Sequence, residues 1–360
     1  MAQAQLTVDI DAITSNWRAL DALTASHVAT AAVVKADCYG LGAARIAPAL
    51  AAAGARTFCV AQAEEGAVVR TALRAAAGAE AAGAGSAEPE ILVFGGYAGG
   101  EAPLFREYAL TPLLNSPGQL RHFRAEMSGA PCGIQLDTGM NRLGFEGLEL
   151  AQTLMEIMAL RPRLVMSHLA CADEPANPMS ALQLAAFNTM TLALPGIRRS
   201  LSATGGTLLG PLYHFDMVRP GVGLYGGAPY MQAKPVVRLS LPVIQVRDVL
   251  PGEIVGYGGT YVAERPRRIA TLSAGYADGL LRSLSGAATL HAGDTPCPLV
   301  GRVSMDLITV DVTGLDEVPA TMDILGPHQG VDTLAAAAGT IGYEILTALG
   351  SRYARVYKGA

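Results

Sequence analysis

Short apolar runs alternate with longer amphipathic segments from residue 30 to about residue 220. The runs are rich in β-branched and aliphatic residues, which favour strands, and the longer segments repeat their apolar positions with a helical period. This alternation predicts repeated βα units. Eight strands are predicted, at residues 31–35, 57–61, 90–94, 110–114, 132–137, 164–168, 198–202 and 217–219. Helices are predicted between them at residues 43–53, 64–77, 117–127, 148–160 and 178–194.

Eight βα units on this scale are typical of a TIM-type barrel, whereas a doubly wound open sheet usually has fewer strands. The pattern changes after Gly226, because residues 226–235 are rich in glycine and proline, as linkers are. Beyond them come short alternating runs and one helical segment at residues 331–348. The sequence therefore predicts an α/β protein, with an N-terminal (β/α)8 barrel domain at residues 1–230 and a C-terminal, mostly β domain at residues 231–360.

Composition and charge exclude several classes of partner. The chain has 360 residues, 51% of them hydrophobic, and its 26 basic and 31 acidic residues give a net charge of −5, so no basic surface for nucleic acid is expected. The five cysteines are scattered and form no C-x-x-C pair, which disfavours a disulfide framework or a metal site and favours a reducing compartment. No secretory signal and no membrane-spanning stretch is visible, so we expect a cytoplasmic protein without a membrane partner.

Lysine is rare in this chain, and one lysine ends the first predicted strand. Only Lys35, Lys234 and Lys358 are lysines, and the other basic residues are arginines. A lysine amine can lose its proton and attack a carbonyl carbon, which a guanidinium cannot do. Lys35 is therefore a Schiff-base candidate. The alternative is a lysine that simply extends its charged end into solvent at the end of a strand.

Other polar residues follow the predicted strands of the barrel. The active site of a TIM barrel lies at the carboxyl ends of its strands. Taken singly, each of these residues has a structural explanation, such as a helix cap for Thr204 or a core histidine for His168. Their shared position favours a functional site. The residues are Asp137 with Arg142, His168, Thr204 and Arg219.

The segment Ala32-Val-Val-Lys-Ala-Asp-Cys-Tyr-Gly40 resembles the pyridoxal-phosphate attachment motif of the alanine racemase family. Further stretches resemble that family in order along both halves of the chain, at residues 9–13, 136–144, 167–173, 218–226, 257–260, 275–279 and 301–306. The resemblance implies a barrel with a β domain, and an obligate homodimer with shared active sites. It also implies racemisation of a small amino acid on pyridoxal 5'-phosphate.

Racemisation requires one base on each face of a planar intermediate. The resemblance implies Lys35 as one base and Tyr257, from the β domain of the partner subunit, as the other, acting on the external aldimine of the substrate. The pKa of a lysine is ordinarily about 10.4, so burial and nearby positive charge must lower the pKa of Lys35 for it to act as a base. The phenol of Tyr257 needs help as well, and a hydrogen-bond chain through His168 to Arg219 is expected to provide it.

The resemblance places Arg219 against the pyridine nitrogen of the cofactor. An arginine keeps its proton, so that nitrogen stays unprotonated and simple proton exchange is favoured. Decarboxylases of the same fold group have a carboxylate at this place. The expected phosphate ligands are the Tyr39 and Thr204 hydroxyls and the amides of Gly221 and Val222. A further ligand is Tyr353 or Ser351, of which we favour Tyr353.

Substrate binding is expected to use Arg142 and the main-chain amide of Met305 from the partner subunit. Many relatives carry a carbamylated lysine at the position of Gln135. Glutamine cannot be carbamylated, but its amide oxygen can accept a hydrogen bond from Arg142. We therefore expect Arg142 to be oriented without the modification.

The sequence thus predicts an isomerase that interconverts L-alanine and D-alanine, either to supply D-alanine for peptidoglycan or to degrade alanine. Three alternatives remain. The first is a racemase of other small amino acids such as serine, and the second is a barrel-type pyridoxal-phosphate decarboxylase. The third is a non-catalytic cofactor carrier, which would lack residues 236–360.

Overall fold

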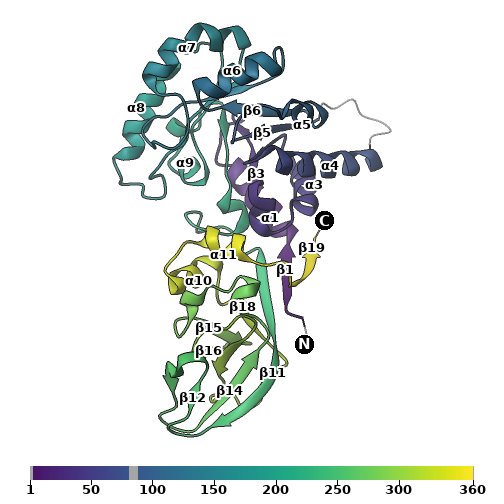
Figure 1. Ribbon diagram of the computed structural model, residues 1–360, viewed down its shortest axis with the longest axis vertical. Coiled ribbons are helices and arrows are strands. Elements are labelled where there is room, and N and C mark those ends of the chain that lie inside the picture. Colours follow the sequence, from purple (N-terminus) through teal and green to yellow (C-terminus); the bar gives the residue numbers. More distant parts are fainter. Residues whose placement is uncertain (1–2, 81–87, 360) are drawn as a thin grey trace. The chain divides into compact units, whose positions relative to one another are not determined.

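The computed structural model describes residues 3–80 and 88–359 (Figure 1). The chain forms two compact units. One unit is Thr14–Leu224, and the other combines Met1–Ile13 with Tyr225–Ala360. Because the positions of the two units relative to each other are not determined, each is described separately.

The first unit contains a parallel sheet with the strand order β3-β4-β5-β6-β7-β8-β9. Two further strands, β2 and β10, pair in parallel with each other. The Ala31 amide, between β2 and β3, donates to the Val218 carbonyl of β10. The Arg219 amide, directly after β10, donates to the carbonyl of Ser202, which follows β9. These bonds close the barrel. The strands are β2 (Ala29–Thr30), β3 (Ala32–Val33), β4 (Thr57–Val60), β5 (Glu90–Val93), β6 (Leu110–Leu114), β7 (Gly133–Gln135), β8 (Leu164–Met166), β9 (Arg198–Ser200) and β10 (Met217–Val218).

Strands are present at all eight predicted positions, and the barrel fold is confirmed. Most of them end one or two residues earlier than predicted. All residues of β4 and β6 are buried, as expected for parallel strands that are covered on both faces. Of the first predicted strand, residues 31–35, only β3 is present. The short strand β2 precedes it, and Lys35 lies beyond β3 at the start of a helical turn.

Helices surround the barrel strands, as Figure 1 shows for α3 to α8. Local capping explains where two of them begin. Helix α6 starts at Pro117 after Ser116, whose side chain accepts from the amide of Gln119, and α7 starts with a reciprocal pair between Glu146 and Glu149. The helices are α1 (Ile10–Asp21), α2 (Lys35–Gly40), α3 (Ala43–Ala53), α4 (Ala63–Glu80), α5 (Ala102–Glu107), α6 (Pro117–Glu126), α7 (Gly147–Leu160), α8 (Met179–Thr191), α9 (Thr204–Leu208), η1 (Pro211–Tyr213) and η2 (Val222–Tyr225).

The second unit is mostly β, as predicted, and contains an eight-stranded sheet with the order β14-β17-β16-β15-β18-β11-β1-β19. A separate pair, β12 and β13, carries the 3-10 turn η3 between its strands. Two short 3-10 turns, η4 (Tyr276–Asp278) and η5 (Arg282–Leu284), follow β14. The strands are β1 (Gln5–Asp9), β11 (Val237–Val249), β12 (Ile254–Val255), β13 (Tyr261–Val262), β14 (Arg267–Leu272), β15 (Thr289–Ala292), β16 (Thr295–Val300), β17 (Ile308–Asp311), β18 (Thr321–Leu325) and β19 (Ala354–Lys358).

Two features of this unit differ from the sequence analysis. Strand β1 pairs with β11 and β19, so the N-terminal strand lies in the sheet of the C-terminal unit instead of the barrel. Its hydrogen-bond partners are more than two hundred residues away, and no local pattern indicates them. The predicted helix at residues 331–348 is two helices, α10 (Val331–Ala338) and α11 (Gly342–Ala348), because Gly339 ends α10 in a left-handed conformation with φ 71°.

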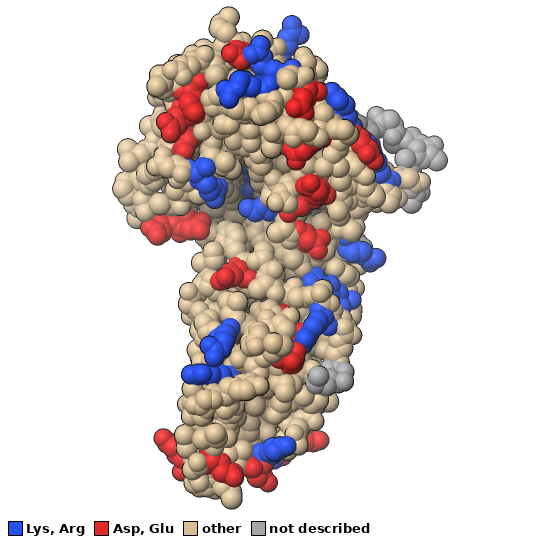
Figure 2. All heavy atoms as spheres, in the orientation of Figure 1, with Lys and Arg blue, Asp and Glu red and all other residues tan. Residues whose placement is uncertain are grey.

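Basic and acidic side chains are interspersed on the face of the molecule drawn in Figure 2. That face therefore offers no continuous basic stripe of the kind that binds nucleic acid. Among the described residues, no helix is both long and apolar enough to cross a membrane.

Candidate active site

Lys35 lies at the carboxyl end of β3 and begins a left-handed turn. The next four residues, from Ala36 to Tyr39, have φ between 51° and 56°, a conformation that costs L-residues roughly 1–2 kcal/mol each. Three bonds hold this turn. The Glu65 side chain accepts from the Ala36 amide at 2.8 Å, Asp37 Oδ1 accepts from the Ala43 amide at 2.7 Å, and Cys38 donates to the Val34 carbonyl at 3.0 Å. These bonds hold the left-handed segment that carries both Lys35 and Tyr39.

The surroundings of Lys35 lower its pKa. Burial of the amine is the largest cause and the Arg142 guanidinium is the second, while Glu65 and Cys59 act in the opposite direction. A lowered pKa increases the fraction of neutral amine at neutral pH, and the neutral amine is the form that attacks a carbonyl carbon. The structure therefore gives Lys35 the property that the sequence analysis required of it.

Arg219 follows β10 and is 1% exposed. Its guanidinium donates to Ser200 Oγ, to the Ser167 carbonyl at 2.7 Å and to the Leu201 carbonyl at 3.3 Å. Burial lowers the pKa of Arg219 to about 10, so it remains charged at neutral pH. No acidic side chain among the described residues forms an ion pair with it. Such a buried cation is balanced by the carbonyl and hydroxyl groups that accept its hydrogen bonds.

His168 follows β8 and is uncharged at neutral pH. Burial and then the charges of Arg219, Arg142 and Lys35 lower its pKa to about 3. The expected chain from His168 to Arg219 contains no direct bond between the two side chains in this structure. The guanidinium instead donates to the carbonyl of Ser167, the residue before His168.

Three of the predicted phosphate ligands lie together. Thr204 Oγ1 is buried and accepts from the amides of Gly221 at 3.0 Å and Gly223 at 3.3 Å. A Cβ atom at Gly221 would overlap the Tyr39 hydroxyl, so the main chain passes close to that hydroxyl only because the residue is glycine. Two hydroxyls and a glycine amide thus lie close together, and such groups are suited to binding a phosphate. Val222, the fourth predicted ligand, begins η2 next to Gly221.

Arg142 lies on an exposed loop after β7. Asp137 orders this loop, because its Oδ1 accepts from the amides of Gly139, Met140 and Asn141. The predicted bond from Arg142 to Gln135 is not present among the described residues. Gln135 is buried, and its side-chain Nε2 donates to the main-chain carbonyl of Leu143 at 3.2 Å. Gln135 therefore contacts the main chain of the loop and not the Arg142 side chain.

The remaining predicted residues lie in the second unit. Tyr257 begins η3 (Tyr257–Gly259) and is 71% exposed. Met305 lies on a loop and is 53% exposed, and its main-chain carbonyl accepts from the Ala277 amide at 3.0 Å. Tyr353 is buried, and its hydroxyl has no hydrogen-bond partner among the described residues, whereas Ser351 is exposed. A buried hydroxyl without a partner is costly, and Tyr353 differs in this respect from the exposed Ser351.

Comparison with known proteins decides the family. Residues 8–229 match the family described as alanine racemase, N-terminal domain, and residues 236–357 match alanine racemase, C-terminal domain. The chain belongs to the alanine racemase family. An alanine racemase of Cereibacter sphaeroides is 61% identical over 99% of both chains, and one of Dinoroseobacter shibae is 59% identical over 100% of this chain and 99% of the relative.

Solved structures of alanine racemases have the same fold. The biosynthetic enzyme of Pseudomonas aeruginosa superposes with a TM-score of 0.91 and 35% identity over the whole of both chains. The enzyme of Bartonella henselae superposes with a TM-score of 0.90 and 36% identity over 99% of this chain and 100% of the other. Its structure contains covalently bound pyridoxal phosphate. The family and the barrel plus β-domain architecture expected from the sequence are confirmed.

Several residues that shape this alanine racemase site were not identified from sequence. Glu65 lies in the first turn of α4, where a carboxylate is common and therefore carries little signal. Ser200 is a small residue inside β9. Arg352 binds Asp278 at 2.6 and 3.0 Å and Asp306 at 2.7 Å, which ties the C-terminal segment to the loop of Met305. Only the contacts of the folded chain distinguish these residues from others of the same type.

Proposed function

We propose that this chain interconverts L-alanine and D-alanine with pyridoxal 5'-phosphate as its cofactor. The observation that carries the proposal is Lys35, an amine of lowered pKa at the end of a barrel strand, with the buried cation Arg219 in the same unit. When bound, pyridoxal phosphate draws electrons from the α-carbon of an amino acid and so acidifies its α-proton.

The residues fit this cofactor. Lys35 Nζ is the atom that would hold it covalently. Tyr39, Thr204, Gly221 and Val222 would hold its phosphate, and Arg219 its ring nitrogen. The glycine at position 221 supports this assignment, since a side chain there would fill the space next to the Tyr39 hydroxyl. Tyr353 would complete the phosphate ligands, because its buried hydroxyl has no partner among the described residues.

Arg219 also determines which reaction is favoured. Its pKa of about 10 keeps the guanidinium charged at neutral pH, so it donates hydrogen bonds without releasing a proton. A carboxylic acid at this place would supply a proton instead. Arg219 therefore limits electron withdrawal, which favours simple exchange of the α-proton over transamination.

Two bases move the proton. Lys35 Nζ takes or delivers it on one face of the substrate, and the Tyr257 hydroxyl does so on the other face. We assign Tyr257 to a second copy of the chain, so that the active form is a homodimer in which residues 231–360 of one subunit complete the barrel site of the other. The high exposure of Tyr257 supports this arrangement, because a base that acts in a neighbouring subunit must project from its own.

The substrate carboxylate would bind the Arg142 guanidinium and the Met305 amide of the second subunit. The loop that Asp137 orders supports the role of Arg142, since it restricts the positions available to an exposed side chain. Gln135 would act indirectly, through its bond to the Leu143 carbonyl.

We further propose a cytoplasmic enzyme, because all five cysteines are free. There it would supply D-alanine for peptidoglycan or take part in alanine breakdown.

The decisive experiment incubates the protein, loaded with pyridoxal phosphate, with L-alanine in deuterated water. We expect D-alanine and deuterium at the α-carbon in both enantiomers. L-Serine in a parallel reaction measures how far the substrate range extends. Release of carbon dioxide, or retention of the α-proton with no change in chirality, would contradict the proposal.

A further inference from the structure

A second cavity lies at the opposite ends of the barrel strands from Lys35. It has a volume of about 400 Å³, and its lining includes Glu90 at the start of β5 and Leu110 at the start of β6. Arg163 directly precedes β8. The cavity is therefore at the amino-terminal ends of these strands, whereas Lys35 and His168 follow the carboxyl ends of β3 and β8. The proposed reaction does not use it.

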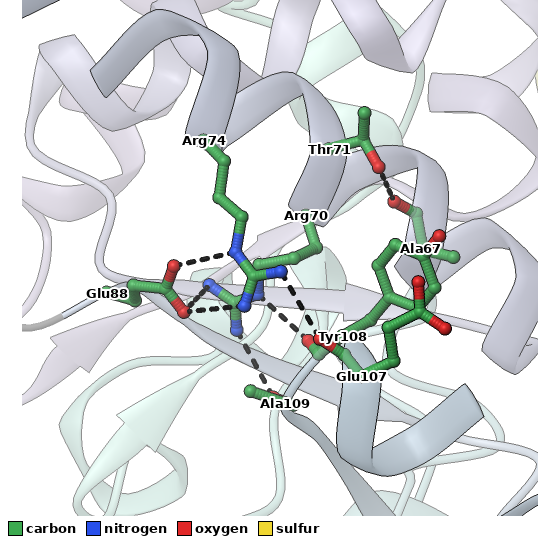
Figure 3. A network of polar contacts seen from close by, with 8 residues as sticks. All are labelled: Ala67, Arg70, Thr71, Arg74, Glu88, Glu107, Tyr108 and Ala109. Carbon is green, nitrogen blue, oxygen red and sulfur yellow. Dashed lines mark hydrogen bonds and ion pairs between the residues drawn. The ribbon is translucent and has the colours of Figure 1, made fainter. Parts of the chain in front are cut away.

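A buried arginine forms one wall of this cavity. Arg70, in α4, is 2% exposed, and it donates to the carbonyls of Tyr108 at 2.9 Å and Ala109 at 3.2 Å (Figure 3). Its Nη1 atom is buried and has no hydrogen-bond partner among the described residues. The nearest acidic atom, Glu88 Oε2, is 3.5 Å away, within ion-pair range but without hydrogen-bond geometry. A buried cationic donor is thus left with unused capacity.

The carboxylates near the cavity already have other partners. Glu88 accepts from Arg74 Nε at 2.8 Å and from Arg74 Nη2 at 3.3 Å, as Figure 3 shows. Glu90 accepts from Arg198 at 3.0 Å. Neither Arg74 nor Arg198 lines the cavity. Three arginines line it, Arg70, Arg106 and Arg163, and its lining is therefore positively charged once Glu88 and Glu90 are paired with Arg74 and Arg198.

The rest of the lining is apolar. It includes Phe105, Leu110 and Met127. Small-molecule sites usually have volumes of about 300–1,000 Å³, with apolar walls and a few polar groups that fix orientation. Arg106 and Arg163 are exposed, so the cavity reaches solvent at its charged side. An arginine fork binds a carboxylate through two parallel hydrogen bonds.

We propose that this cavity is a binding site for a small monocarboxylate with an apolar body. The carboxylate accepts from Arg70 Nη1 and from Arg106 and Arg163 at the mouth, and the apolar part packs on Phe105, Leu110 and Met127. The arginines supply donors for a carboxylate, and the apolar lining matches an organic body that inorganic phosphate lacks.

The test uses the cofactor-loaded protein and fluorobenzoate, observed by fluorine NMR in the presence of saturating alanine. Saturating alanine occupies any carboxylate site at Arg142, so the signal reports the second cavity alone. We expect saturable binding of one fluorobenzoate per chain and no binding of the uncharged fluorobenzamide. The double variant Arg106→Gln/Arg163→Gln should bind at least about tenfold more weakly, because it loses charge-assisted hydrogen bonds.

Arg121→Gln is the matched control, since Arg121 is an exposed arginine of α6 that does not line the cavity. It should bind fluorobenzoate like the unmodified protein. Arg70→Met should abolish binding, provided that it folds. The double variant keeps the test valid if Arg70→Met does not fold, because Arg106 and Arg163 are exposed. Complete displacement by alanine, equal binding of fluorobenzamide, or unchanged affinity in the double variant would each overturn the proposal.

Discussion

The carboxylate of Glu65 accepts a hydrogen bond from the main-chain amide of Ala36 at 2.8 Å. Its second oxygen accepts from the Ala61 amide at 2.7 Å, directly after β4. Glu65 therefore joins the left-handed turn that begins at Lys35 to the end of the neighbouring barrel strand. Glu65 thus links α4 to the residue that follows the proposed catalytic lysine.

Glu65→Gln should lower the pKa of Lys35, because the Glu65 charge raises it. The neutral form of the Lys35 amine would then predominate from a lower pH than in the unmodified protein. We expect the cofactor-free variant to take up pyridoxal phosphate with a pH–rate profile that is shifted toward acid. The variant also loses a charged acceptor, so its free energy of unfolding should fall by about 1–3 kcal/mol. Measuring the uptake rate against pH checks this prediction, and a profile displaced toward alkaline pH would refute it.

Lys35→Ala should eliminate covalent attachment of the cofactor. Borohydride reduction followed by mass spectrometry should find the adduct on the peptide that contains Lys35 in the unmodified protein, and on none in the variant. Lys358→Ala is the control, since Lys358 is an exposed lysine of β19. An adduct that persists in Lys35→Ala would assign the cofactor to another residue.

His168 should make the protein less stable as the pH falls. Its pKa is about 3 in the folded chain, below the ordinary value of 6.5, so the unfolded chain binds a proton first. The free energy of unfolding should therefore rise with pH between about 3 and 6.5, by up to about 1.4 kcal/mol per unit from this residue. Chemical denaturation of the native protein and of His168→Asn across this window measures the contribution. Parallel curves for the two proteins would show that His168 does not titrate as described.

Ser200→Ala should destabilise the barrel unit. Ser200 Oγ accepts from Arg219 and donates to the Met217 carbonyl at 2.6 Å, so the substitution leaves a buried guanidinium donor without this partner. We expect a loss of about 1–3 kcal/mol in the free energy of unfolding. We also expect weaker binding of pyridoxal phosphate. Ser116→Ala, which removes a helix cap far along the chain from Arg219, should lower stability without changing cofactor affinity.

Arg352→Gln should raise KM for alanine more than it lowers kcat. The substitution breaks the ion pairs to Asp278 and Asp306 and releases the loop that carries Met305. A looser loop weakens a ground-state contact to the substrate carboxylate more than the proton transfer itself. Arg265→Gln, at an exposed arginine of the same unit, is the control. A fall in kcat at unchanged KM would argue against this role of Met305.

Much of the barrel could be read from local pattern. Most of the parallel strands are short, apolar and buried, β9 with its two arginines being an exception, and helices with their own period lie between them, so periodicity locates the strands within a few residues. The positions of Lys35, His168, Thr204 and Arg219 follow from the same pattern, because a residue after a barrel strand must lie at the carboxyl end of the barrel. Their chemistry was inferred from residue type and from the resemblance to a family.

Other features depend on groups that are distant in sequence. Strand β1 pairs with β11 and β19, and Arg70 donates to carbonyls 38 and 39 residues away, so no local period indicates either. The four left-handed residues after Lys35 contradict their own local preference, and they persist because Glu65, Asp37 and Val34 supply compensating hydrogen bonds. Hydrophobic period thus specified the strands and the location of the site, while the pKa of Lys35, the partners of Arg219 and the second cavity arose only when folding brought charges and carbonyls together. The reason is physical: burial and Coulomb interactions depend on distances in space, which a linear pattern does not contain.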